Sequence, residues 1–286
     1  MILRCFVFMN FKFKIKHLSP FIGSEIQGLD LSEPLSPESL KQLRILWLDR
    51  KVLVFPDQKL TPQQQINFTQ QLGELDKYPF LEGLNGYPLI AEVLKLPDEK
   101  INFGGVWHSD TSYLKKPAAG ASLLAIEVPD IGGDTIFCNM HRAYEALSEE
   151  IKSEIQHLNS INTSAKDQVS KTRFHRLTNS QRKQVPKVFQ ATHPVVRYHP
   201  ETGEKILYVN EAHTLHIEGW SQQKSDSLLN ELYLHARKPE FQCRVKWSIG
   251  TLLLWDNRST HHYPINDYTG YRRLLHRVSI KGERPV

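Results

Sequence analysis

Cysteine is scarce in this chain, which has 286 residues and only Cys5, Cys138 and Cys243. An odd number of cysteines without paired spacing excludes a disulfide framework and a zinc ribbon. The chain also lacks an apolar run near the roughly 18 residues that a membrane crossing needs. A clustered Lys/Arg run, typical of a nucleic-acid surface, is missing too, although the net charge is +5. The densest basic stretch, residues 171–187, is mixed with Ser, Thr, Asn and Gln, so we expect a solvated loop or lid there.

The sequence shows no targeting signal. Met1 to Phe8 is apolar but short, and Lys12, Lys14 and Lys16 follow it, on the wrong side for a signal peptide. Translation from Met1 and translation from Met9 both remain open. We therefore expect a cytoplasmic protein that binds neither membrane nor nucleic acid, and a homo-oligomer is compatible with this.

The composition is that of an ordinary soluble globular protein with material for a large core, at 40% hydrophobic and 23% charged residues. Neither an internal repeat nor a low-complexity linker divides the chain. We therefore expect a single domain over residues 1–286, with a lid or loop insertion around 160–190.

Local patterns predict a few helices and many short strands. Helices are expected at 37–49 after the cap Ser36, at 61–72 with Thr61 as cap and Pro62 at the first helical position, and at 221–236. Strands are expected where alternating or apolar runs lie between turn residues, at 9–16, 52–55, 121–128, 135–138, 206–209 and 251–255. Many short strands with a few helices predict a mainly β fold with flanking helices, of the jelly-roll double-sheet type.

His108 and Asp110 lie two residues apart in the sequence His108-Ser109-Asp110. Residues i and i+2 of a strand point the same way, so one short segment can give two ligands to one metal ion. The alternative is a surface histidine beside a turn aspartate. Gly104 and Gly105 precede the motif and let the backbone approach closely. Trp107 can pack on one side of the site, and the alternative is a plain core tryptophan.

His262 is the candidate for a third ligand. The buried-looking run 251–255 leads towards it, and on a strand its neighbour His261 would face the opposite way. Two histidines and one carboxylate on one face of a ferrous ion leave positions open, and these can take a bidentate 2-oxo acid and dioxygen. The alternative is a pair of ordinary loop histidines.

Arginines follow the second histidine, with Arg273 eleven residues past His262 and flanked by Arg272 and Arg277. In an extended segment Arg273 and Arg277 share a face. That face could be a solvent-facing row of charge. If it points inward, unpaired buried charge is costly and implies bound anions or acidic partners. One anion would be the far carboxylate of a 2-oxo acid, which an arginine holds by a two-pronged hydrogen bond.

The chain resembles the family of taurine dioxygenase and 2,4-dichlorophenoxyacetate dioxygenase, from about Leu18 to the C-terminus. The resemblance rests on four motifs in family order: Trp107-His108-Ser109-Asp110, Gly132-Gly133-Asp134-Thr135, Trp255-Asp256-Asn257-Arg258 through His262, and Asp267-Tyr268 through Arg273 and Arg277. It implies a double-stranded β-helix with Fe(II), 2-oxoglutarate and O2 as cofactor and co-substrates. The implied catalytic iron ligands are His108, Asp110 and His262. The resemblance further implies that Thr135 and Arg273 hold 2-oxoglutarate and that Arg277 lies near the substrate anion.

The substrate is less well defined by the resemblance. Tyr78 stands where taurine dioxygenase has a histidine for the sulfonate, and Gly104 replaces its asparagine. Tyrosine donates one neutral hydrogen bond where histidine can add positive charge, so taurine fits poorly. His213 and His216 loosely resemble a histidine-bearing segment of the phenoxyacetate enzymes. They are candidates for substrate binding, with a plain polar loop as the alternative.

The leading hypothesis is a dioxygenase that hydroxylates a small anionic substrate and releases succinate and CO2. A non-catalytic cupin-like binding protein and a metal-dependent hydrolase remain as alternatives. Halogenation would need a small residue in place of Asp110, so the sequence disfavours it.

Overall fold

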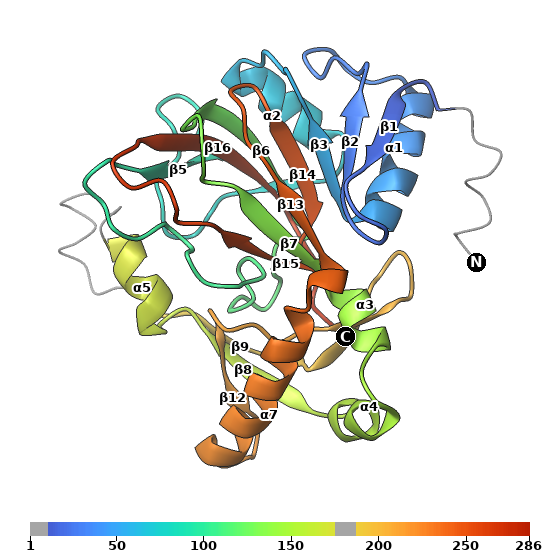
Figure 1. The fold of residues 1–286 in the computed structure, drawn as a ribbon, viewed down its shortest axis with the longest axis vertical. Helices are drawn as coiled ribbons and strands as arrows, with labels where there is room; N and C mark the ends of the chain where they lie inside the picture. Colours follow the sequence, from blue (N-terminus) through green and yellow to red (C-terminus); the bar gives the residue numbers. More distant parts are fainter. Residues whose placement is uncertain (1–10, 175–186) are drawn as a thin grey trace.

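The structure is a computed structural model that describes residues 11–174 and 187–286 (Figure 1). Strands dominate it. They are β1 (Lys14–His17), β2 (Ser24–Gln27), β3 (Val52–Phe55), β4 (Leu75–Asp76), β5 (Ile90–Lys95), β6 (Gly120–Glu127), β7 (Thr135–Asn139), β8 (Asn159–Thr163), β9 (Gln190–Pro194), β10 (Val196–Tyr198), β11 (Lys205–Leu207), β12 (Thr214–Ile217), β13 (Gln242–Val245), β14 (Leu252–Asp256), β15 (Thr260–Pro264) and β16 (Arg273–Ile280). The α-helices are α1 (Pro37–Arg50), α2 (Pro62–Gln70), α3 (Met140–Glu145), α4 (Glu149–Ile155), α5 (Asp167–Phe174) and α7 (Gln222–Ala236). The expectation of a mainly β fold with helices is confirmed.

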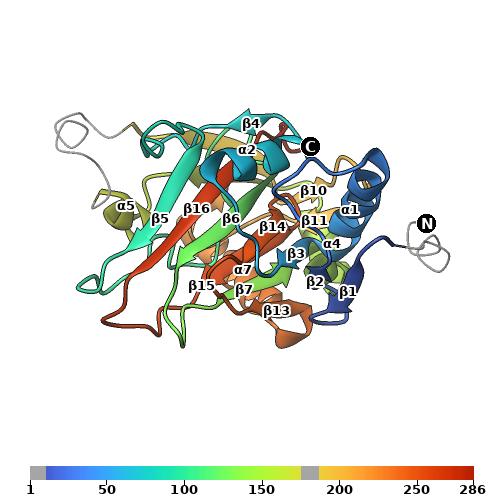
Figure 2. The ribbon, with the colours of Figure 1, turned by 90° about the horizontal axis from the view of Figure 1, so that it is seen from above.

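The large sheet has the order β1-β2-β3-β14-β6-β16, and β16 also pairs with β4 and β5. Its pairs are antiparallel, apart from the parallel pair β2–β3. Helix α2 packs on β16 and β6, and α1 packs on β14 and β3, so both helices cover the outer face (Figure 2).

A smaller sheet, β13-β7-β15, lies against the inner face of the large one. Apolar side chains from both sheets fill the space between them, including Phe137 from β7, Cys243 and Val245 from β13, and Leu253, Trp255 and Leu275 from the large sheet. Inward-facing residues of two packed sheets form such a core because side chains alternate along a strand. A third sheet, β12-β8-β9, and helix α7 lie beyond one end (Figure 1).

The helices begin at capping side chains, of which Ser36 and Thr61 were predicted and Ser221 was not. The side chains of Ser36 and Ser221 accept hydrogen bonds from the backbone N–H groups of Ser39 and Lys224, and Thr61 forms a capping box with Gln64. These side chains satisfy backbone donors that a first turn leaves unpaired. The three predicted helices are thereby confirmed, with ends that differ by at most two residues.

The predicted strands are confirmed at β3, β6, β7, β11 and β14, with small differences in their ends. The strand expected at 9–16 is shorter, because β1 begins at Lys14, and residues 1–10 lie outside the described ranges. The segment expected as a lid or loop, 160–190, includes most of β8 and all of α5 and ends where β9 begins, while residues 175–186 also lie outside the described ranges. In the described part of the chain, no helix has both the length and the apolar character that crossing a bilayer requires.

Candidate active site

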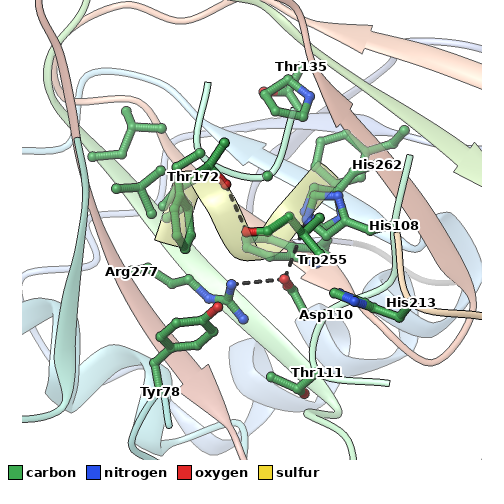
Figure 3. A pocket seen from close by; sticks show the side chains of 18 of the residues that line it. Tyr78, His108, Asp110, Thr111, Thr135, Thr172, His213, Trp255, His262 and Arg277 are labelled. Carbon is green, nitrogen blue, oxygen red and sulfur yellow. Dashed lines mark hydrogen bonds and ion pairs between the residues drawn. The ribbon is translucent and has the colours of Figure 1, made fainter. Parts of the chain in front are cut away.

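His108 and His262 are joined by an isolated antiparallel bridge. The His108 N–H donates to the carbonyl of His262 over 3.1 Å, and the His262 N–H donates back over 2.8 Å. The two imidazole rings lie 4.1 Å apart, and Phe137 stacks on His262 at 5.4 Å. One ligand atom each from His108, Asp110 and His262 can be chosen so that all lie within 4.8 Å of one another. The structure thus brings the three predicted ligands together (Figure 3).

Asp110 reaches this cluster from a turn. The expectation that His108 and Asp110 share a strand is wrong, because only His108 is bridged and Asp110 begins a turn. Asn257 holds that turn: its Oδ1 accepts from the Asp110 N–H at 2.7 Å, and its Nδ2 donates to the Asp110 carbonyl at 3.0 Å. Ser109 adds a hydrogen bond to the Asn257 carbonyl at 2.8 Å. These bonds fix a buried turn that lacks ladder partners.

The protonation states suit metal binding. Burial would raise the pKa of Asp110, but Arg277, then His262 and His108, outweigh it and lower the pKa to about 2. Arg277 Nη1 donates to Asp110 Oδ1 over 2.9 Å. Burial, reinforced by His108, holds the pKa of His262 well below its usual value, and burial also lowers the pKa of His108 despite Asp110. An ionised carboxylate and neutral imidazoles are the states that a metal ion requires of its ligands.

Two polar atoms in this cluster have no partner within the described residues. Asp110 Oδ2 and His262 Nδ1 are buried, and neither has a hydrogen-bond partner among the described residues. His108 Nδ1 lies 2.6 Å from the Val106 carbonyl, and this contact orients the ring as the outer hydrogen bond of a metal-bound histidine does. The donor set therefore fits Fe(II), whose protein ligands of this type are two histidines and one carboxylate.

His261 faces away from the cluster, as its place on β15 predicts. It is buried, and burial followed by His108 and Arg237 lowers its pKa to about 3. It lines a separate small cavity with Trp107 and Cys138. Trp107 stacks on Tyr263 at 5.6 Å, packs against a hydrophobic core cluster and does not line the main cavity, which favours the alternative of a core tryptophan.

The arginines in β16 and the one just before it differ in exposure. Arg273 and Arg277 are only 4% and 6% exposed and line the main cavity, which excludes a solvent-facing row of charge. Arg272 instead pairs with Glu127 at the surface. The Arg273 guanidinium lies 5.5 Å from the Trp247 ring, and Trp247 Nε1 donates to Thr135 Oγ1 over 3.0 Å. Arg273 Nε is buried, and the described residues offer it no hydrogen-bond partner.

The main cavity lies between the two sheets and has a largely apolar wall (Figure 3). Tyr78 and His213 line it as expected, and the Arg277 guanidinium lies 5.5 Å from the Tyr78 ring. His216 is not among the residues that line it, and it lies half-buried on β12, so the structure does not bring this candidate together with the others. Residues that the sequence did not suggest also reach the cavity, among them Tyr113 and, from α5, Val169 and Thr172.

Gly104 lets the backbone approach closely, as expected, whereas the sequence did not single out Asn257. Gly104 has φ +71°, and an added Cβ would lie 3.1 Å from His108 Cε1, so a side chain would press on the ligand. Asn257 lies inside one of the motifs that carry the resemblance, and this was the available signal for its importance.

A mainly β fold that encloses two histidines, a carboxylate and a buried arginine defines the class of Fe(II)- and 2-oxoglutarate-dependent dioxygenases. Comparison with known proteins supports this class. The chain is 32% identical to an alkylsulfatase of Acinetobacter baylyi over 94% of its own length and 85% of the relative. It is also 32% identical to the alpha-ketoglutarate-dependent 2,4-dichlorophenoxyacetate dioxygenase of Cupriavidus pinatubonensis, over 94% and 98%. A crystal structure of a taurine dioxygenase from Burkholderia xenovorans superposes with a TM-score of 0.81 at 31% identity, over 96% and 91%.

The sequence model of the taurine catabolism dioxygenase TauD, TfdA family matches residues 14–279, and the chain belongs to this family. It is therefore a 2-oxoglutarate-dependent oxidoreductase that uses Fe(II) and O2.

Proposed function

We propose that this enzyme hydroxylates a small organic anion with an aromatic or alkyl body and releases succinate and CO2. The observation that carries the proposal is the position of Arg277, a buried cation beside Asp110 in a cavity walled by aromatic and aliphatic side chains. A cation in an apolar cavity binds an anionic group strongly, because water does not compete there. Tyr78 and His213 lie in the same wall and support such a substrate. Since the site has Tyr78 where a second cationic partner would hold a sulfonate, taurine fits less well.

In this proposal His108, Asp110 and His262 hold Fe(II), which supplies the oxidising chemistry once 2-oxoglutarate and O2 are bound. Thr135 and Arg273 hold the far carboxylate of 2-oxoglutarate. Arg277 binds the substrate anion, with His213 and Tyr78 completing that end. The two histidines are neutral and Asp110 is ionised, so all three can bind the metal without first changing protonation state. The apolar wall keeps water from the reacting groups.

We also propose that residues 1–286 form one domain of the jelly-roll or double-stranded β-helix type. The segment around 160–190 would act as a lid, supported by Val169 and Thr172, which contribute to the cavity wall. We further propose that the enzyme is cytoplasmic and that it can form a homo-oligomer.

The test is succinate release from the Fe(II)-loaded protein across taurine, alkyl sulfates, alkanesulfonates and aryloxyacetates, in air and under anaerobic conditions. We expect oxygen-dependent succinate with the anions of larger apolar body and much less with taurine. Arg277→Met should raise the substrate requirement by about one to two decades, as expected when a hydrogen bond to a charged group is lost. Taurine as the best substrate, or product formation without oxygen as in a hydrolase, would contradict the proposal.

A further inference from the structure

Lys95 is the cross-strand partner of Arg273. In the register of β5 and β16, Arg273 stands opposite Lys95, and Leu275 stands opposite Val93. Side chains of directly opposed residues in an antiparallel pair lie on one face of the sheet. Val93, Leu275 and Arg273 all line the main cavity, so Lys95 extends the cavity-facing row of β5 by one step beside Arg273.

Two buried cations thus occupy opposed positions on the sheet, and neither forms a salt bridge with a carboxylate of the described residues. Lys95 is 2% exposed, and its Nζ has no hydrogen-bond partner within residues 11–174 and 187–286, as is also true of Arg273 Nε. Burial lowers the pKa of Arg273, and Tyr268 and Asp134 partly oppose this effect. The nearby carboxylates Asp134 and Asp267 accept hydrogen bonds from other groups. Asp134 accepts from Arg244 at 2.6 Å, and Asp267 accepts from the Gly133 N–H at 2.7 Å.

An aromatic ring that is held in place lies beside Lys95. Its ammonium lies 4.5 Å from the centroid of Tyr268, whose hydroxyl donates to Asn102 Oδ1 over 2.7 Å. The Asn102 amide in turn donates to the carbonyls of Pro264 and Ile265. A cation over such a fixed ring is oriented as well as stabilised. The ring does not neutralise Lys95, and like charges directly opposite on a sheet destabilise it.

We propose that Lys95 is a second cation for the far carboxylate of 2-oxoglutarate, acting together with Arg273. This inference rests on the proposed role of Arg273. A carboxylate has two oxygens and room for several donors, so one such group can satisfy both cations and remove the cost of their unpaired burial. The pair selects 2-oxo acids that carry a second carboxylate over 2-oxo monoacids.

The experiment measures binding rather than turnover. Anaerobic calorimetric titration of the Fe(II)-loaded protein gives the Kd of 2-oxoglutarate and of 2-oxopentanoate, which has the same carbon chain without the far carboxylate. Lys95→Met should raise the Kd of 2-oxoglutarate by about ten- to a hundredfold and leave that of 2-oxopentanoate within about twofold. Lys95→Arg keeps the charge and should retain most of the affinity. Lys116→Met, at an exposed lysine, is the matched control and should change neither.

Arg273→Met, measured in parallel, distinguishes failure of the whole co-substrate site from failure of Lys95 alone. If this variant binds 2-oxoglutarate normally, the proposed co-substrate site fails and the role of Lys95 fails with it. If Arg273→Met loses affinity while Lys95→Met stays within about twofold of the parent, only the role of Lys95 is overturned. Equal losses for both 2-oxo acids in Lys95→Met would also overturn it, since they indicate distortion. Lys95→Gln provides a polar alternative if the methionine variant does not fold.

Discussion

Asp110 remains ionised in a buried site because Arg277 lies 2.9 Å from it. Desolvation acts against the charge, and without a cation the carboxyl would tend to take up a proton. A protonated carboxyl is a poor metal ligand. Arg277 therefore affects two steps in the proposal, the binding of the substrate anion and the readiness of Asp110 for iron. Substrate binding to Arg277 is in this sense coupled to the metal site.

The choice between adjacent histidines gives the first prediction. His262→Ala should lose at least about ten- to a hundredfold in iron affinity, the effect typical of removing only an outer contact of a ligand. His261→Ala should keep iron, because that side chain lines a different cavity on the other face of β15. Iron content after equilibrium dialysis measures both. Normal iron in His262→Ala with loss in His261→Ala would reverse the assignment.

The adjacent arginines give the second prediction. Arg273→Ala should raise the 2-oxoglutarate concentration needed for half-maximal succinate release by about one to two decades. Its neighbour supplies the control: Arg272→Ala removes a surface ion pair with Glu127, and surface pairs contribute little. Equal dependence on 2-oxoglutarate in the two variants would remove Arg273 from that role.

At the scale of elements, the site depends on a loop that lies against β15. His108 is fixed by one bridge to His262, and Gly104 lets this loop turn back over the His108 ring. Asn257, which follows β14, holds the next turn. The two ligands of the His-Ser-Asp motif are thus oriented by contacts with a strand and a turn far along the chain.

Gly104 and Gly203 allow a matched prediction about this loop. Both have φ +71°, where alanine is strained, but an added Cβ meets His108 only at Gly104 and nothing within 4 Å at Gly203. Each Gly→Ala change should therefore cost about 1 kcal/mol of stability or somewhat more. Only Gly104→Ala should also weaken iron binding, because it displaces the His108 ring. Denaturant unfolding and iron dialysis measure the two effects, and equal iron affinities would contradict this account.

The sequence predicted elements better than it predicted the orientation of single side chains. The caps Ser36, Thr61 and Ser221 are local signals, and the helices that they begin are confirmed. His216 was named from a loose resemblance of its segment, and the structure places it on β12, outside the cavity wall, where β12 changes register against β8. Long-range pairs such as Lys95 with Arg273 depend on sheet register, which a single sequence does not reveal.

At the scale of the whole molecule, a buried ionic network joins distant segments. Asp256, which ends β14, accepts from Arg258 Nη2 at 2.7 Å and from His199 Nε2 at 2.9 Å. His199 Nδ1 accepts from the N–H groups of Glu201 and Thr202, so its proton lies on Nε2. Glu201 then pairs with Arg258 and with Arg44 of α1. This network attaches the turn between β10 and β11 to the large sheet and its covering helix.

The network could not have been predicted in detail from the sequence. The motif Trp255-Asp256-Asn257-Arg258 indicated family membership and contains one partner of Asp256, Arg258, but it gave no sign of the others. Those other members, His199, Glu201 and Arg44, lie in a hairpin and in a helix, and only the packed fold brings them together. His108 and Asp110 could be predicted from their short spacing, and His262 and the class from motifs in family order, whereas this network depends on tertiary packing.

Asp256 gives the last prediction, which concerns stability and pH. Burial would raise the pKa of Asp256, but Arg258 and His199 have the larger combined effect and hold this pKa well below its usual value. Asp256→Asn leaves Arg258 buried without this partner and should cost about 3–5 kcal/mol at pH 7. A depressed folded-state pKa means that the stabilisation is complete above the unfolded pKa of about 3.9 and falls by roughly 1.4 kcal/mol per pH unit below it. Urea unfolding of both proteins between pH 7 and pH 3 should therefore show a constant difference down to about pH 4 and a shrinking one below. Glu201→Gln, at a partly exposed carboxylate, is the control and should cost much less. A difference that stays constant down to pH 3 would show that shape rather than charge makes Asp256 important.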